Sequence, residues 1–157
     1  KLKMVDNKYM ITNGPAFINE KNFYHTDSKK RIIYKIKIDK NLNILEKKIF
    51  KKFVDVEGFP DGMTTDHFKN LWVCHFGGSS ISVFNQKGKK IYKIKLPAKN
   101  VTNCTFGGAK NNDLYITTAL KGLKEIDKKK YNLSGSLFKV RTNSKGMTSK
   151  SFNVIYD

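Results

Sequence analysis

The sequence predicts an all-β protein built from β-propeller blades, and three observations support this fold class. One pattern, a polar residue followed ten or eleven positions later by a short apolar strand, occurs three times, starting at Asn13, Asp61 and Asn103. These starts lie 48 and 42 residues apart, close to the period of about 45 residues that is typical of propeller blades. Alternating β-rich segments recur along the chain, whereas no stretch sustains an amphipathic helical pattern. Because equivalent residues of successive blades converge on one axis, we expect these three polar residues to meet in space.

The first two units follow the same order of turn and strands. Asn13-Gly14 opens the first unit, in which strands are expected at 23–26 and 32–38. Asp61-Gly62 opens the second unit, in which strands are expected at 71–75 and 81–84. Gly, Asn, Asp and Lys residues separate these segments and mark turns.

The third unit contains an insertion. Asn103-Cys104 opens it, and strands are expected at 114–118 and 137–140. Residues 119–135 lie between these strands, and we expect the lysine run Lys128–Lys130 within them to form an exposed loop.

The expected core consists of apolar side chains that pack between blades. Trp72 is the largest of them, and we expect it between two blades and not at a ligand. The full expected set is Phe17, Phe23, Ile33, Met63, Leu71, Trp72, Ile81, Phe106, Leu114 and Phe138.

The 157 residues hold fewer blades than a closed propeller needs, since propellers close with about four to eight. The chain begins with Lys1, and the run from Ser151 to Tyr156 is typical of a natural C-terminus. We therefore expect a piece of a longer protein that lacks N-terminal blades.

The net charge of +18 first suggests a nucleic-acid partner. However, only Arg31 and Arg141 of the 31 basic residues are arginine, the residue that reads nucleic acid through paired hydrogen bonds. The lysines are scattered over turns and alternate strand positions, and abundant Lys, Ile and Asn are also what an AT-rich genome encodes. We expect a solvated lysine surface and no specific nucleic-acid partner, with a polyanion-binding surface as the alternative.

Cysteine spacing and hydropathy exclude several other classes of protein. Cys74 and Cys104 lack the spacing of a metal or redox motif, so we expect two free thiols, with a disulfide as the alternative. No apolar run approaches the length of a membrane span. We expect a cytoplasmic protein without a membrane partner.

The repeated polar positions are the candidate site. A carboxylate at Asp61 and a carboxamide at Asn13 would aim oxygen atoms at one point, and hard divalent cations prefer oxygen ligands. Taken alone, Asn13-Gly14 and Pro60-Asp61-Gly62 are only turn signatures. Acids are also concentrated here: four of the 13 fall within 12 residues, namely Asp55, Glu57, Asp61 and Asp66.

The histidines and serines offer no second site. His25 and His75 follow equivalent strands, so they are expected either as structural histidines or at the mouth of a central channel. No nucleophile elbow and no Ser-His-Asp order are present in the sequence.

Several motifs together resemble one family. Asn13-Gly14-Pro15-Ala16-Phe17 and Tyr24-His25-Thr26-Asp27-Ser28 resemble motifs of the family of senescence marker protein 30 (regucalcin) and gluconolactonase. The segments 57–63, 71–73 and 101–108 are similar to further motifs of that family. The resemblance covers nearly the whole chain in the right order.

This resemblance implies a six-bladed propeller of which residues 1–157 are the C-terminal half, with about three blades. It implies one divalent metal cation in the central channel and hydrolysis of a sugar lactone. Asn13 and Asp61 map onto metal ligands, Asp61 also onto the catalytic acid/base, and Asn103 onto a substrate-binding position that lines the pocket. Calcium is the expected cation, with zinc, magnesium and manganese as alternatives. The family's N-terminal Glu ligand and the Arg and Asn that hold the substrate have no counterpart in this chain, which implies that this chain is inactive alone.

Two other functions remain open. A cation that polarises a C=O group also polarises a P=O group, so an aryl-ester or phosphotriester hydrolase on the same scaffold is one alternative. A propeller that only binds calcium or another protein, without catalysis, is the other.

Overall fold

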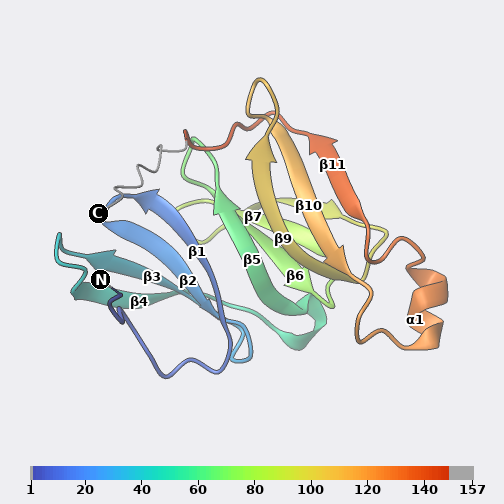
Figure 1. Cartoon of the computed structure of the whole chain (residues 1–157), viewed down its shortest axis with the longest axis horizontal. Helices are drawn as coiled ribbons and strands as arrows, with labels where there is room; N and C mark the ends of the chain where they lie inside the picture. The colour runs from blue at the N-terminus through green and yellow to red at the C-terminus, as the bar shows by residue number, and fades with distance from the viewer. Residues whose placement is uncertain (1, 149–157) are drawn as a thin grey trace.

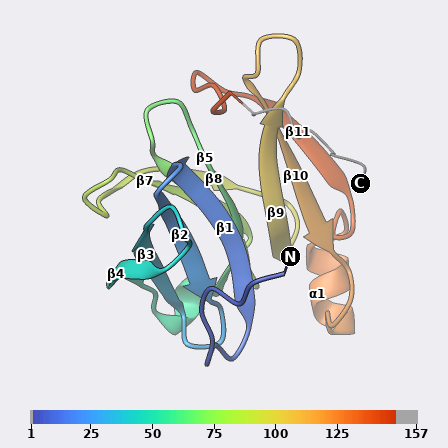
Figure 2. The same ribbon diagram turned by 60° about the vertical axis from the view of Figure 1, so that its left-hand side comes forward.

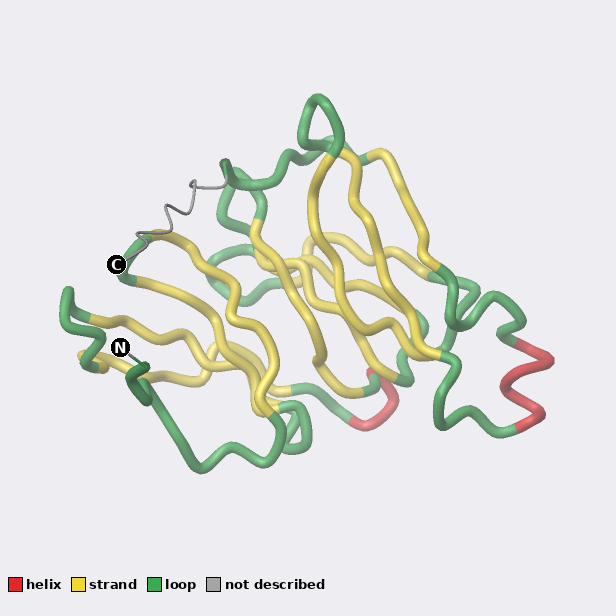
Figure 3. Tube along the Cα trace, viewed as in Figure 1, coloured by secondary structure: helices red, strands yellow, loops and turns green. Residues whose placement is uncertain are grey.

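The computed structural model describes residues 2–148, which form three antiparallel sheets standing side by side (Figures 1 and 3). The first sheet, or first blade, contains β1 (Thr12–Asn19), β2 (Asn22–Asp27), β3 (Ile32–Ile38) and β4 (Ile44–Lys52). A short 3-10 helix at Asp55–Glu57 leads to the second blade, which contains β5 (Phe59–Thr65), β6 (Leu71–Phe76), β7 (Ser80–Phe84) and β8 (Lys90–Lys95). The third blade contains β9 (Asn100–Gly107), β10 (Asp113–Ala119) and β11 (Leu137–Arg141), with helix α1 (Glu125–Lys130) before its last strand.

The first strands of the three blades lie next to one another. β5 contacts β1 on one side and β9 on the other (Figures 1 and 2). Each blade then runs outward through consecutive antiparallel strands. The prediction of an all-β fold built from repeated propeller blades is confirmed.

The second blade is buried on both faces because it lies between the other two. Along β6, Leu71 and Val73 pack toward the first blade, whereas Trp72 and Cys74 pack toward the third. Successive strand residues point to opposite faces, so a blade between two neighbours needs apolar residues at consecutive positions. The expected position of Trp72 between two blades is confirmed.

Two apolar layers hold the blades together. The layer between the first and second blades contains Ala16, Ile18, Tyr24, Ile33, Phe53, Met63, Leu71, Val73 and Phe84. The layer between the second and third contains Trp72, Cys74, Ile81, Val83, Leu96, Val101, Cys104, Leu114 and Ile116, with Phe106 and Phe138 half-buried against it.

The structure corrects two core predictions. Phe23 is buried, but it packs against Ile36 and Ile38 of its own blade and not between blades. Phe17 is 46% exposed, because its strand neighbours Ala16 and Ile18 occupy the face of β1 that packs on the second blade. Strand alternation then turns Phe17 to the opposite face.

The insertion also differs from expectation, since Lys128–Lys130 belong to α1 and not to a loop. Glu125 and Asp127 lie in the first turn of this helix and the three lysines in its last turn, an arrangement that complements the helix dipole. Six residues are too few to show an amphipathic period, which is why the pattern gave no signal.

None of the helices in residues 2–148 has the length and apolar character needed to cross a membrane. The predicted run Ser151–Tyr156 lies outside the described residues.

Candidate functional site

The three repeated polar residues line one small cavity. It has a volume of about 340 Å³ and lies where β1, β5 and β9 meet. The prediction that these residues meet in space is therefore confirmed, although their chemical roles stay predictions. The lining residues are Asn13, Gly14, Pro15, Asp61, Gly62, Met63, Thr102 and Asn103.

Each inner strand is irregular at this cavity. Asn13 pairs with Thr26 and Ala16 with Tyr24, so β1 carries one extra residue relative to β2. The β5–β6 ladder repeats this irregularity between Pro60 and Met63, and the β9–β10 ladder has an extra residue at Thr102. A β-bulge redirects side chains locally, which explains why three regular-looking strands turn polar groups to the same place.

The carboxamide of Asn13 is held by a neighbouring serine. Its Nδ2 donates a hydrogen bond to Ser28 Oγ at 2.8 Å. Within residues 2–148, the Oδ1 atom of Asn13 accepts no hydrogen bond, so the half-buried side chain has a free carbonyl oxygen at the cavity.

Asp61 is the unusual acid of its segment. Asp55 pairs with Arg31 at 3.2 Å and Glu57 with Lys90 at 3.0 Å, whereas Asp66 accepts a hydrogen bond from Trp72 Nε1 at 3.0 Å. In the part of the chain that the structure describes, Asp61 forms no ion pair.

Burial raises the pKa of the Asp61 carboxyl to about 6, and a hydrogen bond from the backbone N–H of Gly62 opposes this shift. Removing a carboxylate from water without a counterion disfavours its charged form. Although the sequence contains 31 basic residues, none of those in residues 2–148 pairs with the Asp61 carboxylate.

Asn103 differs from the other two polar residues. It is exposed, and its Oδ1 accepts a hydrogen bond from the backbone N–H of Cys104 at 2.8 Å. It lies directly against Gly62, where even a Cβ atom would overlap its side chain. Its carbonyl oxygen is therefore already engaged, which suits a residue that lines the cavity better than a cation ligand.

The residues present fit a hard divalent cation. Asn13 and Asp61 supply a carbonyl oxygen and a carboxylate, the ligand types that calcium, magnesium and manganese prefer. A cation would also neutralise the charge that burial now disfavours on Asp61. Across residues 2–148, no three His, Cys, Asp or Glu side chains come together, so these two residues would be only part of a ligand set.

The histidines lie away from the cavity lining. His75 is 1% exposed; its Nε2 is 2.9 Å from Ser82 Oγ, and its ring packs edge-on against Phe53. His25, on β2, packs edge-on against Tyr9 of the segment before β1. The structural interpretation holds for the buried His75, although its Nδ1 has no hydrogen-bond partner among the described residues, and the alternative at a channel mouth is wrong for it. For the half-buried His25, both interpretations stay predictions.

Cys74 and Cys104 are free and buried, as expected. They belong to the apolar layer between the second and third blades. The two cysteines therefore form no disulfide bond, and that alternative is wrong.

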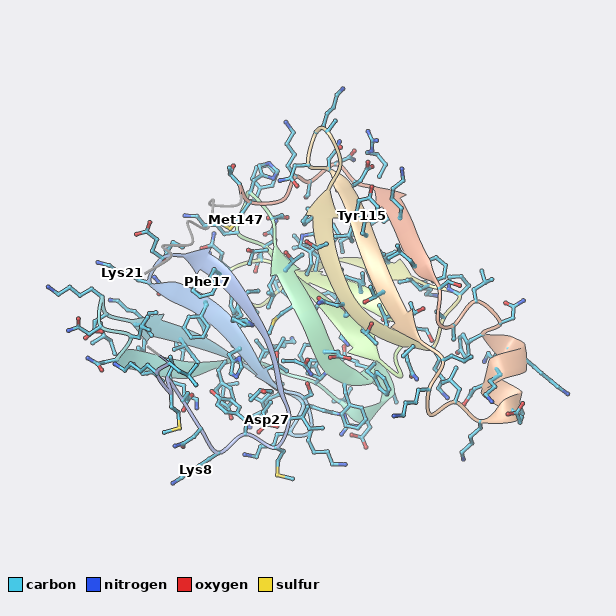
Figure 4. The ribbon with its side chains drawn as sticks, in the orientation of Figure 1. Lys8, Phe17, Lys21, Asp27, Tyr115 and Met147 are labelled. Carbon is cyan, nitrogen blue, oxygen red and sulfur yellow. The ribbon has the colours of Figure 1, made fainter. Side chains whose placement is uncertain are left out.

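A larger cavity of about 930 Å³ lies at the other ends of the inner strands. Its lining includes Phe17 at the end of β1, Lys21 and Met147, which Figure 4 labels. Thr65 of β5 and Phe106 of β9 also line it. None of the predicted site residues lines it.

Comparison with known proteins identifies similar sequences. The sequence model of the family described as "SMP-30/Gluconolactonase/LRE-like region" matches residues 1–120. Regucalcin of Xenopus laevis is 35% identical over 136 residues, which cover 83% of this chain and 44% of the relative. A putative sugar lactone lactonase, YvrE, of Bacillus subtilis is 32% identical over 148 residues, which cover 92% of this chain and 51% of the relative.

A solved structure supports the same comparison. A luciferin-regenerating enzyme matches with a TM-score of 0.83 and 32% identity, covering 94% of this chain and 50% of that chain. The three sheets thus correspond to three blades of a six-bladed propeller. The chain spans about half the length of the curated relatives it matches.

Proposed function

Because the chain belongs to the SMP-30/gluconolactonase/LRE-like family, we propose that the protein hydrolyses a sugar lactone with one divalent cation held in part by Asn13 and Asp61. Relatives that match this chain include a putative sugar lactone lactonase. Since the chain spans about half of such relatives, the proposed activity is that of the full-length protein.

The proposal depends mainly on the environment of the Asp61 carboxylate. Its carboxylate has no cationic partner among the described residues, although acids on both sides of it are paired or hydrogen-bonded. The free Oδ1 of Asn13 lines the same cavity. Two oxygen ligands from adjacent blades, neither of them paired with a cationic side chain among the described residues, are what a cation site requires and what a purely structural turn does not.

Calcium is the cation we propose, with magnesium, manganese and zinc as alternatives. When bound, such a cation supplies Lewis-acid polarisation of the ester carbonyl.

Three side chains of this chain have separate roles in the proposed reaction. Asp61 accepts a proton from the attacking water and later returns one to the leaving ring oxygen. The pKa of about 6 belongs to the cation-free protein, and a bound cation would lower it, which favours the charged form that accepts the proton. Asn13 holds the cation through the carbonyl oxygen of its fixed carboxamide. Asn103 lines the wall of the cavity against which the substrate lies.

Lactone hydrolysis by the full-length protein tests the proposal. The protein is stripped with a chelator and then given single divalent cations, with aldonolactones, an aryl ester and a phosphotriester as substrates. We expect turnover of an aldonolactone that stops on chelation and returns with one cation. Preferred turnover of the aryl ester or phosphotriester would move the function to the other hydrolase class, and cation binding without any turnover would indicate a binding propeller.

Replacing Asp61 by Asn tests its role directly. At cation concentrations that saturate each protein, as determined by calorimetry, we expect Asp61→Asn to lower turnover by about 10²–10⁴-fold, the range for removing a general acid/base. Turnover that returns to the wild-type value once the cation site is filled would instead assign Asp61 to cation ligation alone. Asp55→Asn is the matched control, since Asp55 is 89% exposed at its side chain and lies in the same segment. Turnover that is equal in the two variants would contradict the assignment.

A further inference from the structure

A buried hydroxyl lies between the two proposed cation ligands. Ser28 follows β2 and is 5% exposed. Its Oγ contacts Asn13 Nδ2 at 2.8 Å and the backbone carbonyl oxygen of Pro60 at 2.6 Å. Pro60 immediately precedes Asp61, so one hydroxyl connects the Asn13 side chain on β1 to the strand segment that carries Asp61 on β5.

The chemistry of these three groups fixes the orientation of the Asn13 carboxamide. A serine hydroxyl has one hydrogen to donate, and a carbonyl oxygen can only accept. The Ser28 hydrogen therefore goes to Pro60 O, which leaves a lone pair of Oγ facing Asn13. Only the NH₂ group of Asn13 can satisfy that lone pair, so Oδ1 must point away from Ser28.

The backbone of Ser28 is fixed as well. Its N–H donates to Ile11 O at 2.9 Å, and its carbonyl oxygen accepts from Arg31 N–H at 3.0 Å. The hydroxyl is thus presented from a rigid position, and the orientation of the carboxamide does not depend on a mobile partner.

We propose that Ser28 is a positioning residue, which locks Asn13 with its carbonyl oxygen free for the cation and couples Asn13 to the Asp61 segment across two blades. This inference rests on the proposed function, because it assigns a purpose to the orientation of a proposed ligand. Residues that orient a metal ligand in this way are typically worth 10- to 100-fold in metal affinity, and we expect a loss in about that range for Ser28→Ala.

Calcium binding to the chelator-treated full-length protein, measured by isothermal titration calorimetry, is the primary test. Ser28→Ala removes the hydroxyl, and Ser28→Thr keeps it. Ser80→Ala is the matched control, because Ser80 is also buried and donates its hydroxyl to a backbone carbonyl, that of Gly78, at 2.9 Å. The thermal midpoint of each variant is recorded, so that a general loss of stability is not mistaken for a loss of affinity.

A double-mutant cycle separates positioning from general support. If Ser28 acts through Asn13, Ser28→Ala weakens calcium binding in the wild-type background but has no further effect in an Asn13→Ala background. Equal losses in both backgrounds, or an equal loss in Ser80→Ala, would overturn the proposal. Recovery of affinity in Ser28→Thr supports it.

A second measurement needs no metal. In protein labelled with ¹⁵N at asparagine, we expect the side-chain amide protons of Asn13 to exchange slowly with solvent in the wild type and rapidly in Ser28→Ala. If the wild type binds no divalent cation but shows this difference, the proposed function fails while the positioning of Asn13 stands. If exchange is the same in both proteins, the positioning role is wrong whatever the metal result.

Discussion

His75 and Asp61 have opposite pKa shifts, although burial is the main cause of both. Burial lowers the pKa of His75 to about 4 and raises that of Asp61 to about 6. In each case the charged form is the one that loses contact with water. The surroundings of the two side chains differ, however, because His75 is enclosed between blades whereas Asp61 lines the small cavity.

The lowered pKa of His75 predicts acid sensitivity. Between about pH 6.5 and 4, an unfolded chain protonates this histidine while the folded protein does not, so the free energy of unfolding falls as pH falls. The shift from 6.5 to about 4 corresponds to about 3 kcal/mol, to order of magnitude. We expect His75→Gln to lose less stability than the wild type between pH 7 and pH 4, measured by urea unfolding.

Asp61 changes the free energy of unfolding in the opposite direction over an overlapping pH range. Its raised pKa means that the folded protein holds this proton more tightly, so stability contributed by Asp61 decreases as pH rises toward about 6. Because that contribution is the same in wild type and His75→Gln, the difference between the two proteins isolates His75. Parallel stability curves would show that His75 titrates normally.

At the residue scale, the sequence predicted those site residues that repeat. Asn13, Asp61 and Asn103 occupy equivalent positions, so their convergence follows from the period alone. Ser28 was not assigned, because its role depends on partners 15 and 32 residues away and on the direction of a single hydroxyl hydrogen. A sequence pattern records spacing, whereas a hydrogen-bond direction exists only in the folded structure.

At the scale of secondary-structure elements, the three inner strands must approach closely to form the cavity. Gly62 on β5 lies against Asn103 and the backbone of Thr102 on β9, where an added Cβ would come within 2.6 Å of Thr102 O. The sequence marked Gly62 only as part of a turn signature. Its actual function is to let two adjacent strands approach each other, which periodicity cannot show because it depends on the packing of neighbouring blades.

Gly62→Ala is therefore expected to separate β5 from β9. The displaced atoms include backbone, which cannot move as a side chain does, so we expect a loss of about 1–3 kcal/mol in unfolding free energy. Gly107→Ala is the control at the end of β9, where the nearest atom to an added Cβ is the Tyr115 ring at 3.3 Å. Equal unfolding midpoints in denaturant for the two variants would contradict a tight β5–β9 approach.

At the scale of the whole molecule, the distribution of lysines on the surface and the repeat of the blades are separate features. The expected solvated lysine surface agrees with exposed lysines on the outermost strands of two blades, Lys47, Lys48 and Lys52 on β4 and Lys90, Lys93 and Lys95 on β8. The number of blades in the chain and their order were predictable because the repeat is long and regular. The helix α1 and the outward orientation of Phe17 were not, since both depend on local packing of a single element.

The lysine surface predicts weak binding of nucleic acid without sequence preference. With a net charge of +18, the full chain attracts phosphates at low salt, but its two arginines offer little paired recognition of bases. We expect duplex DNA binding, followed by fluorescence anisotropy, to be measurable near 50 mM salt and to fall by at least about 10³-fold near 200 mM if six or more phosphates are contacted.

Exchange of Lys93 and Lys95 for Glu tests whether β8 contributes to that binding. Each phosphate contact removed should reduce the slope of log affinity against log salt by about 0.9. Lactone turnover by the full-length protein should stay unchanged, because β8 is the strand of its blade farthest from the inner strand β5. Binding that persists at 200 mM salt and prefers one DNA sequence would instead favour a dedicated polyanion site. In that case the lysines would have a function of their own and would not simply be a solvated surface around the proposed hydrolase.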